Sequence, residues 1–386
     1  RVGAYGSRLP CMQLAPEGRR HAGAVACLAA LLSVAPSNAA PLPRLPAASL
    51  TRPNLLGCLA RGPLLVEGAF GGTLVDEAAE ALMGCLGGEV VECQQRTAEG
   101  TDLFEATLAD FCALAFRSAH GSALSLFAER LINDKAPAVA ALLRVDGSGP
   151  FEADMFAHFP ESLRPAGACL VAGGEGARCP LHADPFEWVG TNTCLEGAKL
   201  WRFLGPAPGL DEALGAYRLP SVAWGGGGEG LSAGWQSDVD LYARRAPSAP
   251  SAAALFRDAP EAERRGLLEA MADPATGQLL PEVHLPEGTL EAFVHGVQLP
   301  GDLVLIPPRW YHQTYCPGPC LGLAGQYLDS FCRDRVFAHV LGWAGVEGAR
   351  AEDVPYDVPP EEQVRAFLRI LDDALSDSSR GPRSPA

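Results

Sequence analysis

Apolar residues occur along the chain mostly in short runs, and these runs have the length of strands rather than helices. The clearest is 303–306, a wholly apolar run between Gly-Asp and Pro-Pro turn signals, which predicts a buried strand. Residues 197–204 predict another strand, with Lys199, Trp201 and Phe203 on one face. Further strands are expected at 62–70, 123–127, 168–172, 291–299 and 321–328.

Two segments instead show the three-to-four-residue spacing of amphipathic helices. In the first, Thr107 to Asp110 resembles an N-terminal capping box, and an apolar stripe follows, formed by Leu108, Phe111, Cys112 and Ala115. In the second, the residues 359–362 (Pro-Pro-Glu-Glu) start a helix. Its apolar face is formed by Val364, Phe367, Leu368, Leu371 and Leu375. A short helix over 74–86 and a surface helix over 258–271 are also expected.

These elements predict a mainly β fold with flanking helices, built as one large domain. Residues 1–52 are expected to be a leader, disordered or targeting, and residues 53–345 the folded body. Glycine-rich and Pro/Ser/Ala-rich stretches over about 205–290 predict an irregular insertion between two strands of that body. Residues 346–386 are expected to form the C-terminal helix and a disordered tail.

Composition narrows the class of protein. The 386 residues are 48% hydrophobic, and 43 Gly with 33 Pro favour a β-rich fold with long loops. The formal charge of −16 argues against direct nucleic-acid binding, because such a protein needs a basic face to neutralise phosphates. It is compatible with a basic protein or peptide substrate. We expect no transmembrane segment, because no run reaches about 20 apolar residues.

The compartment stays open. After Met12, Arg19-Arg20 precede an apolar run over 22–35 and then the small residues 37–39. This order is typical of a secretory signal or an organelle-targeting leader. A disordered Ala- and Pro-rich leader explains the same residues equally well.

Twelve cysteines are scattered without a CxxC pair, and several lie inside apolar segments. Buried free thiols in a reducing compartment are therefore favoured over a disulfide framework. A zinc site formed by Cys316, Cys320, Cys332 and His339 is a weaker alternative, because its spacing is poor.

The residues with the clearest chemistry are His182, Asp184 and the distant His312. His182 and Asp184 are two apart, so on an extended strand both side chains point to the same face. His312 follows the 303–306 strand and a turn, which aims it back inward. Two histidines and one carboxylate form the facial triad that holds Fe(II) in non-haem oxygenases. The same ligands also suit a cupin that uses Zn(II) or Mn(II).

An iron centre of this type uses 2-oxoglutarate and O2 as cosubstrates. The far carboxylate of 2-oxoglutarate needs a cationic partner inside an apolar barrel, because an unpaired buried carboxylate is costly. Lys199, beside Trp201 and Phe203, fits that role. Its alternatives are an ion pair with Asp184 or a rim position with its ammonium group in solvent.

Three segments, 179–185, 197–204 and 299–312, together resemble a JmjC domain, which is a cupin-type double-stranded β-helix, or jelly-roll. The similarity continues upstream through 122–127 and 151–156. Altogether it covers about residues 54–345, apart from the insertion. Within the family, the chain is most similar to the branch described as arginine demethylases and lysyl hydroxylases.

The resemblance implies iron ligation by His182, Asp184 and His312, and a salt bridge from Lys199 to 2-oxoglutarate. It places Asn192 near the cosubstrate, although capping of a loop or turn explains that residue almost as well. It also implies a protein or peptide substrate and a nuclear or cytoplasmic location.

The sequence departs from this branch at three positions of the cosubstrate pocket. Ala324 replaces a Thr, Gln326 an Asn and Ser125 a Tyr. The leading hypothesis is a Fe(II)- and 2-oxoglutarate-dependent dioxygenase that hydroxylates or demethylates a side chain. A catalytically silent JmjC-like binding module is the alternative, since the altered pocket then no longer holds 2-oxoglutarate.

Overall fold

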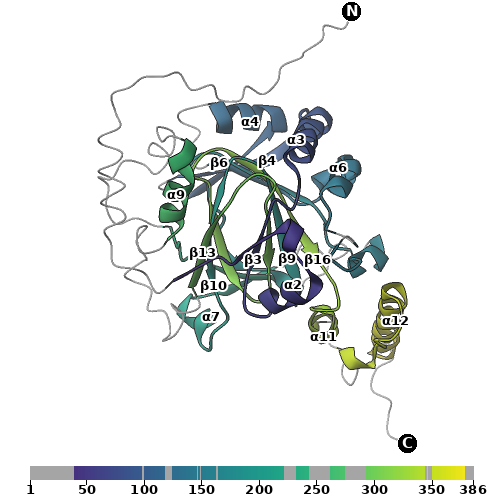
Figure 1. Ribbon diagram of the computed structural model, residues 1–386. Helices are drawn as coiled ribbons and strands as arrows, with labels where there is room; N and C mark the ends of the chain where they lie inside the picture. Colours follow the sequence, from purple (N-terminus) through teal and green to yellow (C-terminus); the bar gives the residue numbers. More distant parts are fainter. Residues whose placement is uncertain are drawn as a thin grey trace, which may run out of the picture.

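Two mixed β-sheets flanked by helices form the framework of the protein (Figure 1). The prediction of a mainly β fold with flanking helices is confirmed. The structure, a computed structural model, describes residues 39–378 except 98–99, 118–123, 146, 148, 162–163, 221–231, 243–260, 274–292, 344–345 and 347–349. Within these limits, no helix combines the length and the apolar character needed to cross a membrane.

The first sheet carries most of the residues of interest. Its strand order is β1 (Ala40–Pro41), β13 (Phe293–Gln298), β10 (Lys199–Leu204), β15 (Tyr311–Tyr315), β8 (Leu181–Ala183), β12 (Ser232–Ser237) and β11 (Tyr217–Pro220). The order in the second sheet is β2 (Arg44–Pro46), β3 (Leu64–Glu67), β14 (Leu303–Ile306), β9 (Val189–Glu196), β16 (Cys320–Tyr327), β7 (Cys169–Gly173), β6 (Leu124–Ala128), β4 (Val90–Arg96) and β5 (Thr101–Thr107).

The two sheets face each other across an inner core. Trp201 and Phe203 of β10 pack there with Val304 and Ile306 of β14. Successive strands change sheet: β7, β8, β9 and β10 alternate between the two, and β13, β14, β15 and β16 do so again. Residues far apart in sequence therefore meet in the space between the sheets.

Helices cover the outer faces. A large core on the second sheet receives α2 (Arg52–Leu59), α3 (Gly72–Leu86), α4 (Leu108–Arg117), α5 (Leu131–Lys135), α6 (Pro137–Leu142), η2 (Met155–His158), η5 (Ala351–Asp353), α11 (Arg333–Trp343) and α12 (Pro360–Ser378). The first sheet is covered by α7 (Leu210–Ala213) and α9 (Glu261–Ala272). Two short turns of helix, η1 (Ala47–Ser49) and η4 (Pro185–Glu187), complete the elements.

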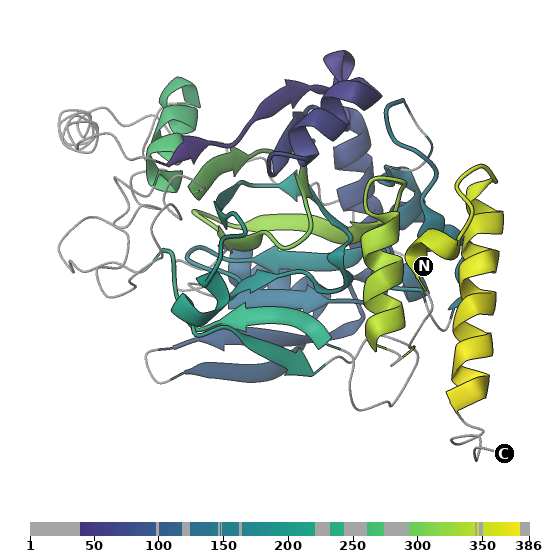
Figure 2. The same cartoon turned by 90° about the horizontal axis from the view of Figure 1, so that it is seen from below.

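The predicted amphipathic helices are confirmed. The apolar stripe of α4 is buried, and the backbone N–H of Asp110 donates to Thr107 Oγ1 at 3.1 Å. In α12, Val364 and Phe367 are fully buried. The Phe367 ring stacks on Phe337 of α11 at 4.1 Å between centroids, so α11 and α12 lie side by side (Figure 2).

The body of the fold begins earlier than predicted. Residues 1–38 of the expected leader lie outside the described residues, but 39–52 are part of the structure. β1 pairs with β13 and β2 pairs with β3. Leu42 between them is 2% exposed and belongs to the inner core. A single Leu among prolines gives no strand pattern in the sequence, which explains the error.

The range predicted as an irregular insertion, 205–290, contains a strand of the first sheet. β12 pairs with β8, so Gln236 lies opposite His182. The expected surface helix is present as α9, but Leu268 and Ala272 of this helix are buried against the first sheet. Part of this range therefore supports the strand that carries His182.

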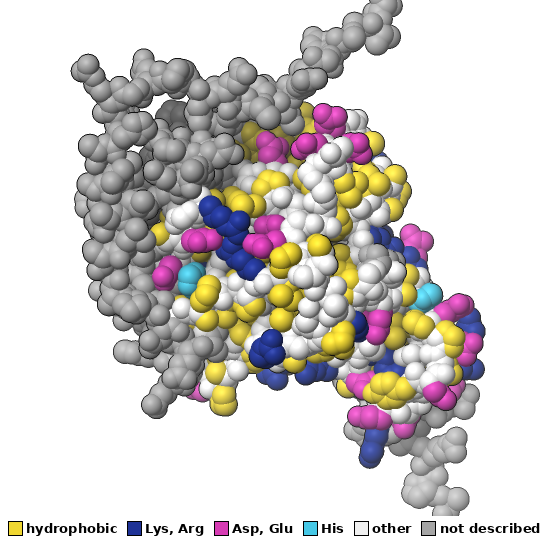
Figure 3. All heavy atoms as spheres, viewed as in Figure 1, with side chains coloured by type: hydrophobic (Ala, Val, Ile, Leu, Met, Phe, Trp, Pro, Cys, Tyr) yellow, Lys and Arg dark blue, Asp and Glu magenta, His cyan; other side chains and the backbone are white. Residues whose placement is uncertain are grey.

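Charged side chains of both signs mix on the face drawn in Figure 3. One network joins Arg44 and Arg265 to Glu67 and Glu269, at distances of 2.8 to 3.6 Å.

Arg202 fastens α9 to the outer face of the first sheet. The side chain is fully buried, and its guanidinium donates to the carbonyl oxygens of Ala272, Met271 and Leu241. The same group lies 4.2 Å from the ring centre of Tyr242. These backbone acceptors lose their partner if the guanidinium is removed.

We expect Arg202→Met to lower the free energy of unfolding by about 2–4 kcal/mol, because buried carbonyls then stay without donors. Urea denaturation measures the change. Arg365→Met is the matched control, since Arg365 is exposed and pairs only with Glu361 across one helical turn. It should cost no more than about 0.5 kcal/mol. Equal losses in the two variants would contradict the role assigned to Arg202.

Candidate metal centre

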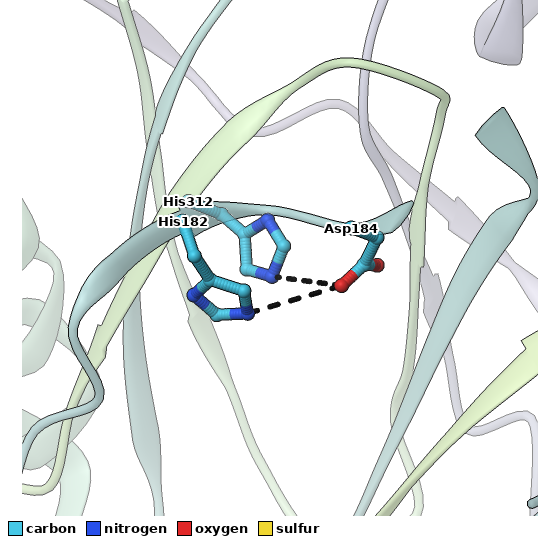
Figure 4. Close-up of side chains that lie close together, drawn as sticks. All are labelled: His182, Asp184 and His312. Carbon is cyan, nitrogen blue, oxygen red and sulfur yellow. Dashed lines mark ion pairs between the residues drawn. The ribbon is translucent and has the colours of Figure 1, made fainter. Parts of the chain in front are cut away.

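The two histidines and the aspartate predicted as metal ligands lie together. His182 is the central residue of β8, Asp184 follows this strand, and His312 is the second residue of β15. β8 and β15 are antiparallel neighbours, and His182 pairs directly with His312. The ring centroids are 4.1 Å apart, and Asp184 lies beside both rings (Figure 4).

The ligand atoms are spaced for one small metal ion. His182 Nε2 lies 3.8 Å from Asp184 Oδ1, and His312 Nε2 lies 4.0 Å from the same oxygen. No other group of three or more potential ligands is found in the described part of the chain. A metal about 2.1 Å from each ligand sets neighbouring ligand atoms about 3–3.5 Å apart, so a contraction of about half an ångström completes the fit.

Backbone carbonyls orient both imidazole rings. His182 Nδ1 donates to the carbonyl oxygen of Pro180 at 2.9 Å, and His312 Nδ1 donates to that of Trp310 at 3.1 Å. A carbonyl oxygen only accepts, so the proton resides on Nδ1 in each neutral ring. The lone pair of Nε2 is left for a metal.

Gly190 provides the space that Asp184 occupies. It is the second residue of β9, and a Cβ atom placed on it would overlap Asp184 Oδ2. Any other residue there displaces the carboxylate. This role could not be predicted from the sequence, because an isolated Gly in a strand has several common explanations.

The two histidines differ in acidity. Burial and the neighbouring His182 lower the pKa of His312 to about 4, so its ring is neutral at neutral pH. Burial also acts against the charged form of His182, but the hydrogen bond and charge of Cys179, followed by Asp184, raise its pKa to about 9. A metal ion must therefore displace a proton from His182.

Cys179 is a site residue that the sequence did not indicate. Burial raises the pKa of its thiol, but the hydrogen bond and charge of His182 together with the hydrogen bonds from Thr314 outweigh burial and leave the pKa lowered. The backbone N–H and the hydroxyl of Thr314 donate to its sulfur at 3.1 and 3.2 Å. Cys179 thus holds the second strand of the site, β15, against His182.

Lys199 and Asn192 meet in the space between the two sheets. The Lys199 ammonium group donates to Asn192 Oδ1 at 3.1 Å, and the two residues are 4% and 7% exposed. Lys199, Trp201 and Phe203 share one face of β10, as predicted. The Trp201 and Phe203 rings stack at 5.3 Å and lie 6.0 and 6.2 Å from the His312 ring. Of the alternatives for Lys199, a solvent-exposed rim position is wrong.

The three departures from the family pattern map onto neighbouring strands. Ala324 of β16 lies directly opposite Asn192, and Gln326 lies opposite Gly190. Gln326 Oε1 is buried without a hydrogen-bond partner among the described residues. Ser125 of β6 pairs with Gly173 of β7, and β6 is three strands away from β9, which carries Asn192. The altered positions thus face the same space as Asn192 and the Gly190–Asp184 contact.

The alternative of a zinc site formed by three cysteines and His339 is wrong. Cys316 and Cys320 face each other with sulfurs 3.3 Å apart, but Cys332 lies in the outer core and His339 packs against Phe186. Every cysteine in the described ranges is a free thiol, and most are buried, as expected.

Other histidines and aspartates lie apart from the triad. His295 pairs with Arg202 across β13 and β10, and burial lowers its pKa. Asp240 is paired with Arg178 at 2.5 Å, and Asp238 accepts from Tyr217. His284 lies outside the described residues.

A cavity of about 340 Å³ adjoins the carboxylate side of the site. Asp184 lines this cavity, whereas His182 and His312 do not. The neighbours of the two histidines, Ala183 and Tyr311, point to the opposite face of the strands and line the cavity. Its wall also contains Phe186, Glu187 and Arg309, the non-glycine residues with positive φ in the described structure, at 57°, 57° and 65°. Strained backbone of this kind is common around binding sites.

Neither models of known protein families nor curated proteins give a match to this sequence. The function is therefore inferred from the geometry of the site.

We expect Gly190→Ala to weaken divalent-metal binding by about 10- to 100-fold, because the added methyl group displaces Asp184 Oδ2. Calorimetric titration with Mn(II) or Co(II) measures the affinity. Gly84→Ala is the matched control, since a Cβ there meets nothing within 4 Å. If Gly190→Ala folds and binds metal like the control, the three residues do not form the metal site.

Proposed function

We propose that the protein is a Fe(II)- and 2-oxoglutarate-dependent dioxygenase that hydroxylates or demethylates a side chain of a protein. The observation that carries this proposal is the combination of two features in one inter-sheet space. One is the His182–Asp184–His312 group, and the other is a buried cation, Lys199, without an ion pair among the described residues.

The strand arrangement supports a jelly-roll of the cupin and JmjC type. Two runs of four strands, β7–β10 and β13–β16, each alternate between the facing sheets. Their central strands interleave in the order β13-β10-β15-β8 in one sheet and β14-β9-β16-β7 in the other. In such a double-stranded β-helix, the ligands from β8 and β15 point into the barrel.

The donor set suits Fe(II). Two neutral imidazole nitrogens and one carboxylate occupy one face of a metal and leave the opposite face for other ligands. When bound, iron with 2-oxoglutarate and O2 supplies oxidation of a C–H bond, coupled to decarboxylation of 2-oxoglutarate to succinate. Asp184 and His182 are 26% and 33% exposed at their side chains, so ligands reach the site from one side.

Lys199 and Asn192 fit the far carboxylate of 2-oxoglutarate. A buried ammonium group held only by an amide oxygen is poorly compensated, and a carboxylate would compensate it. Lys199 lies four residues along β10 from Phe203, which pairs with His312, an offset of about 13 Å between backbones. The long Lys side chain and a five-carbon dicarboxylate together bridge a gap of that order, while Trp201 and Phe203 exclude water from it.

The substrate side is the acidic cavity next to Asp184. Glu187, Asp211 and Glu212 line this cavity, and Tyr311 donates to Asp211 at 3.0 Å. Carboxylates at the entrance favour a basic protein or peptide segment as substrate.

A silent binding module is the second candidate, and Ala324 is the observation that favours it. Ala324 lies opposite Asn192 and has no hydroxyl to hold a cosubstrate carboxylate. A cupin that uses Zn(II) or Mn(II) for other chemistry shares the triad, but leaves Lys199 without a dicarboxylate partner.

Anaerobic titration of the protein with Fe(II) and 2-oxoglutarate separates these three. We expect a visible metal-to-ligand charge-transfer band, and we expect His182→Ala to abolish it because the triad loses a ligand. His158→Ala, which alters a histidine in η2, should retain the band. Absence of the band in the unmodified protein would refute the dioxygenase proposal.

Lys199→Met tests the cosubstrate assignment separately. We expect 2-oxoglutarate to bind at least about tenfold more weakly, because its far carboxylate stays unpaired in a buried place. The same band reports the affinity. The chain has only two lysines, and the other, Lys135, is exposed and near Glu89. Lys135→Met is therefore the control, and equal affinities in the two variants would exclude Lys199 as the carboxylate partner.

A further inference from the structure

A second reactive group lies at the Lys199 end of the barrel. Cys316 follows β15 and Cys320 begins β16, with only Pro317-Gly318-Pro319 between them. Their sulfur atoms are 3.3 Å apart. Cys316 is 6% exposed and Cys320 is fully buried, so only a small molecule reaches them without unfolding.

Backbone contacts on both sides hold this pair. The N–H of Cys316 donates to the carbonyl of Ala177, and its carbonyl accepts from Gly176, both at 2.8 Å. Cys320 pairs with Gly173 across β16 and β7. A disulfide bond is about 2.05 Å long, so the sulfurs need to approach by only about 1.2 Å. Side-chain rotation and a small shift of the Pro-Gly-Pro turn supply such a movement.

The pair also adjoins the cation of the barrel. A Cβ atom on Gly322, two residues after Cys320, would lie 3.1 Å from Lys199 Nζ. The turn at Gly197, which leads into β10, packs against the carbonyl of Pro319. A hydrogen bond from Cys316 lowers the pKa of the Cys320 thiol, and the Lys199 charge adds to this effect against burial. The sulfur of Cys320 is thus favoured as a nucleophile.

We propose that Cys316 and Cys320 are a peroxide-reactive dithiol that closes to an intramolecular disulfide beside Lys199. The Cys320 thiolate attacks one oxygen of hydrogen peroxide, the O–O bond breaks, and the released hydroxide takes a proton to become water. The Cys316 sulfur then attacks the sulfenic sulfur, the S–O bond breaks, and a second water leaves. Two thiols lose two electrons, and one peroxide gains them.

Closure has a consequence for Lys199, and this part rests on the proposed function. The movement is taken up by the Pro317–Pro319 turn, which touches the Gly197 turn and so displaces the start of β10. We expect several-fold weaker binding of 2-oxoglutarate to the oxidised protein, reversed by dithiothreitol.

One tryptic peptide reports the disulfide directly. Residues 310–333 contain no internal Lys or Arg and carry Cys316, Cys320 and Cys332. The full chain is treated with hydrogen peroxide and then denatured in the presence of N-ethylmaleimide, which labels every free thiol, before digestion with trypsin. We expect the peptide to carry three labels before oxidation and one after it, on Cys332. Three labels after oxidation, or a peptide in which Cys332 is the oxidised residue, would overturn the proposal.

Matched variants complete the test. In Cys316→Ser and in Cys320→Ser, oxidation should no longer remove two labels from the peptide. In Cys332→Ser, oxidation should still remove two labels. Cys316→Ala replaces Cys316→Ser if the hydroxyl prevents folding. Band titration of the oxidised and reduced protein tests the link to Lys199, and equal affinities would overturn that link. The label count needs no cosubstrate, so it stands even if no charge-transfer band forms.

Discussion

The direct pairing of His182 with His312 is the constraint on which the candidate site depends. β8 is only three residues long, and it is held by β15 on one side and β12 on the other. Side chains alternate along a strand, so a slip of one residue would turn His182 to the outer face. The carbonyls that orient both rings, from Pro180 and Trp310, belong to the residues directly before the same two strands. The geometry of the candidate site therefore depends on the register between β8 and β15.

The sequence was sufficient to predict that His182, Asp184 and His312 come together, but not what surrounds them. The two-residue spacing of His182 and Asp184, and the apolar strand before His312, are local patterns with one simple explanation. The contact of Gly190 with Asp184 joins β9 of the second sheet to the end of β8 in the first, which no local pattern reports. Cys179 lies only three residues before His182, but its bond to Thr314 depends on the position of β15. β9, which carries Asn192, was not separated from its neighbours because Thr, Asn and Cys interrupt its apolar residues. Leu42 and β12 were assigned to a leader and an insertion because their composition resembles loops, although their partners are sheet strands.

Lys199 is a charged side chain in the buried space between the two sheets. Lys199 donates to an amide oxygen, and its charge acts on the thiols of Cys194, Cys316 and Cys320. An arrangement of this kind gains from a diffusible anion and is sensitive to the state of the sulfurs. The change to Ala324 opposite Asn192 alters the same wall. The His182–Asp184–His312 group and the Lys199–Asn192 pair thus come from different strands, and each can be lost without the other.

The positive-φ residues at the cavity rim give the site a mechanical character. Phe186 and Glu187 directly follow the strand and ligand they support, and Phe186 is clamped by the Trp188 ring at 5.4 Å. Each such backbone conformation costs on the order of 1–3 kcal/mol and persists only while packing enforces it. The backbone strain of this segment therefore acts on the neighbouring Asp184. If heat or loss of the Phe186–Trp188 contact loosens the packing, we therefore expect the carboxylate of Asp184 to change position before the two sheets separate.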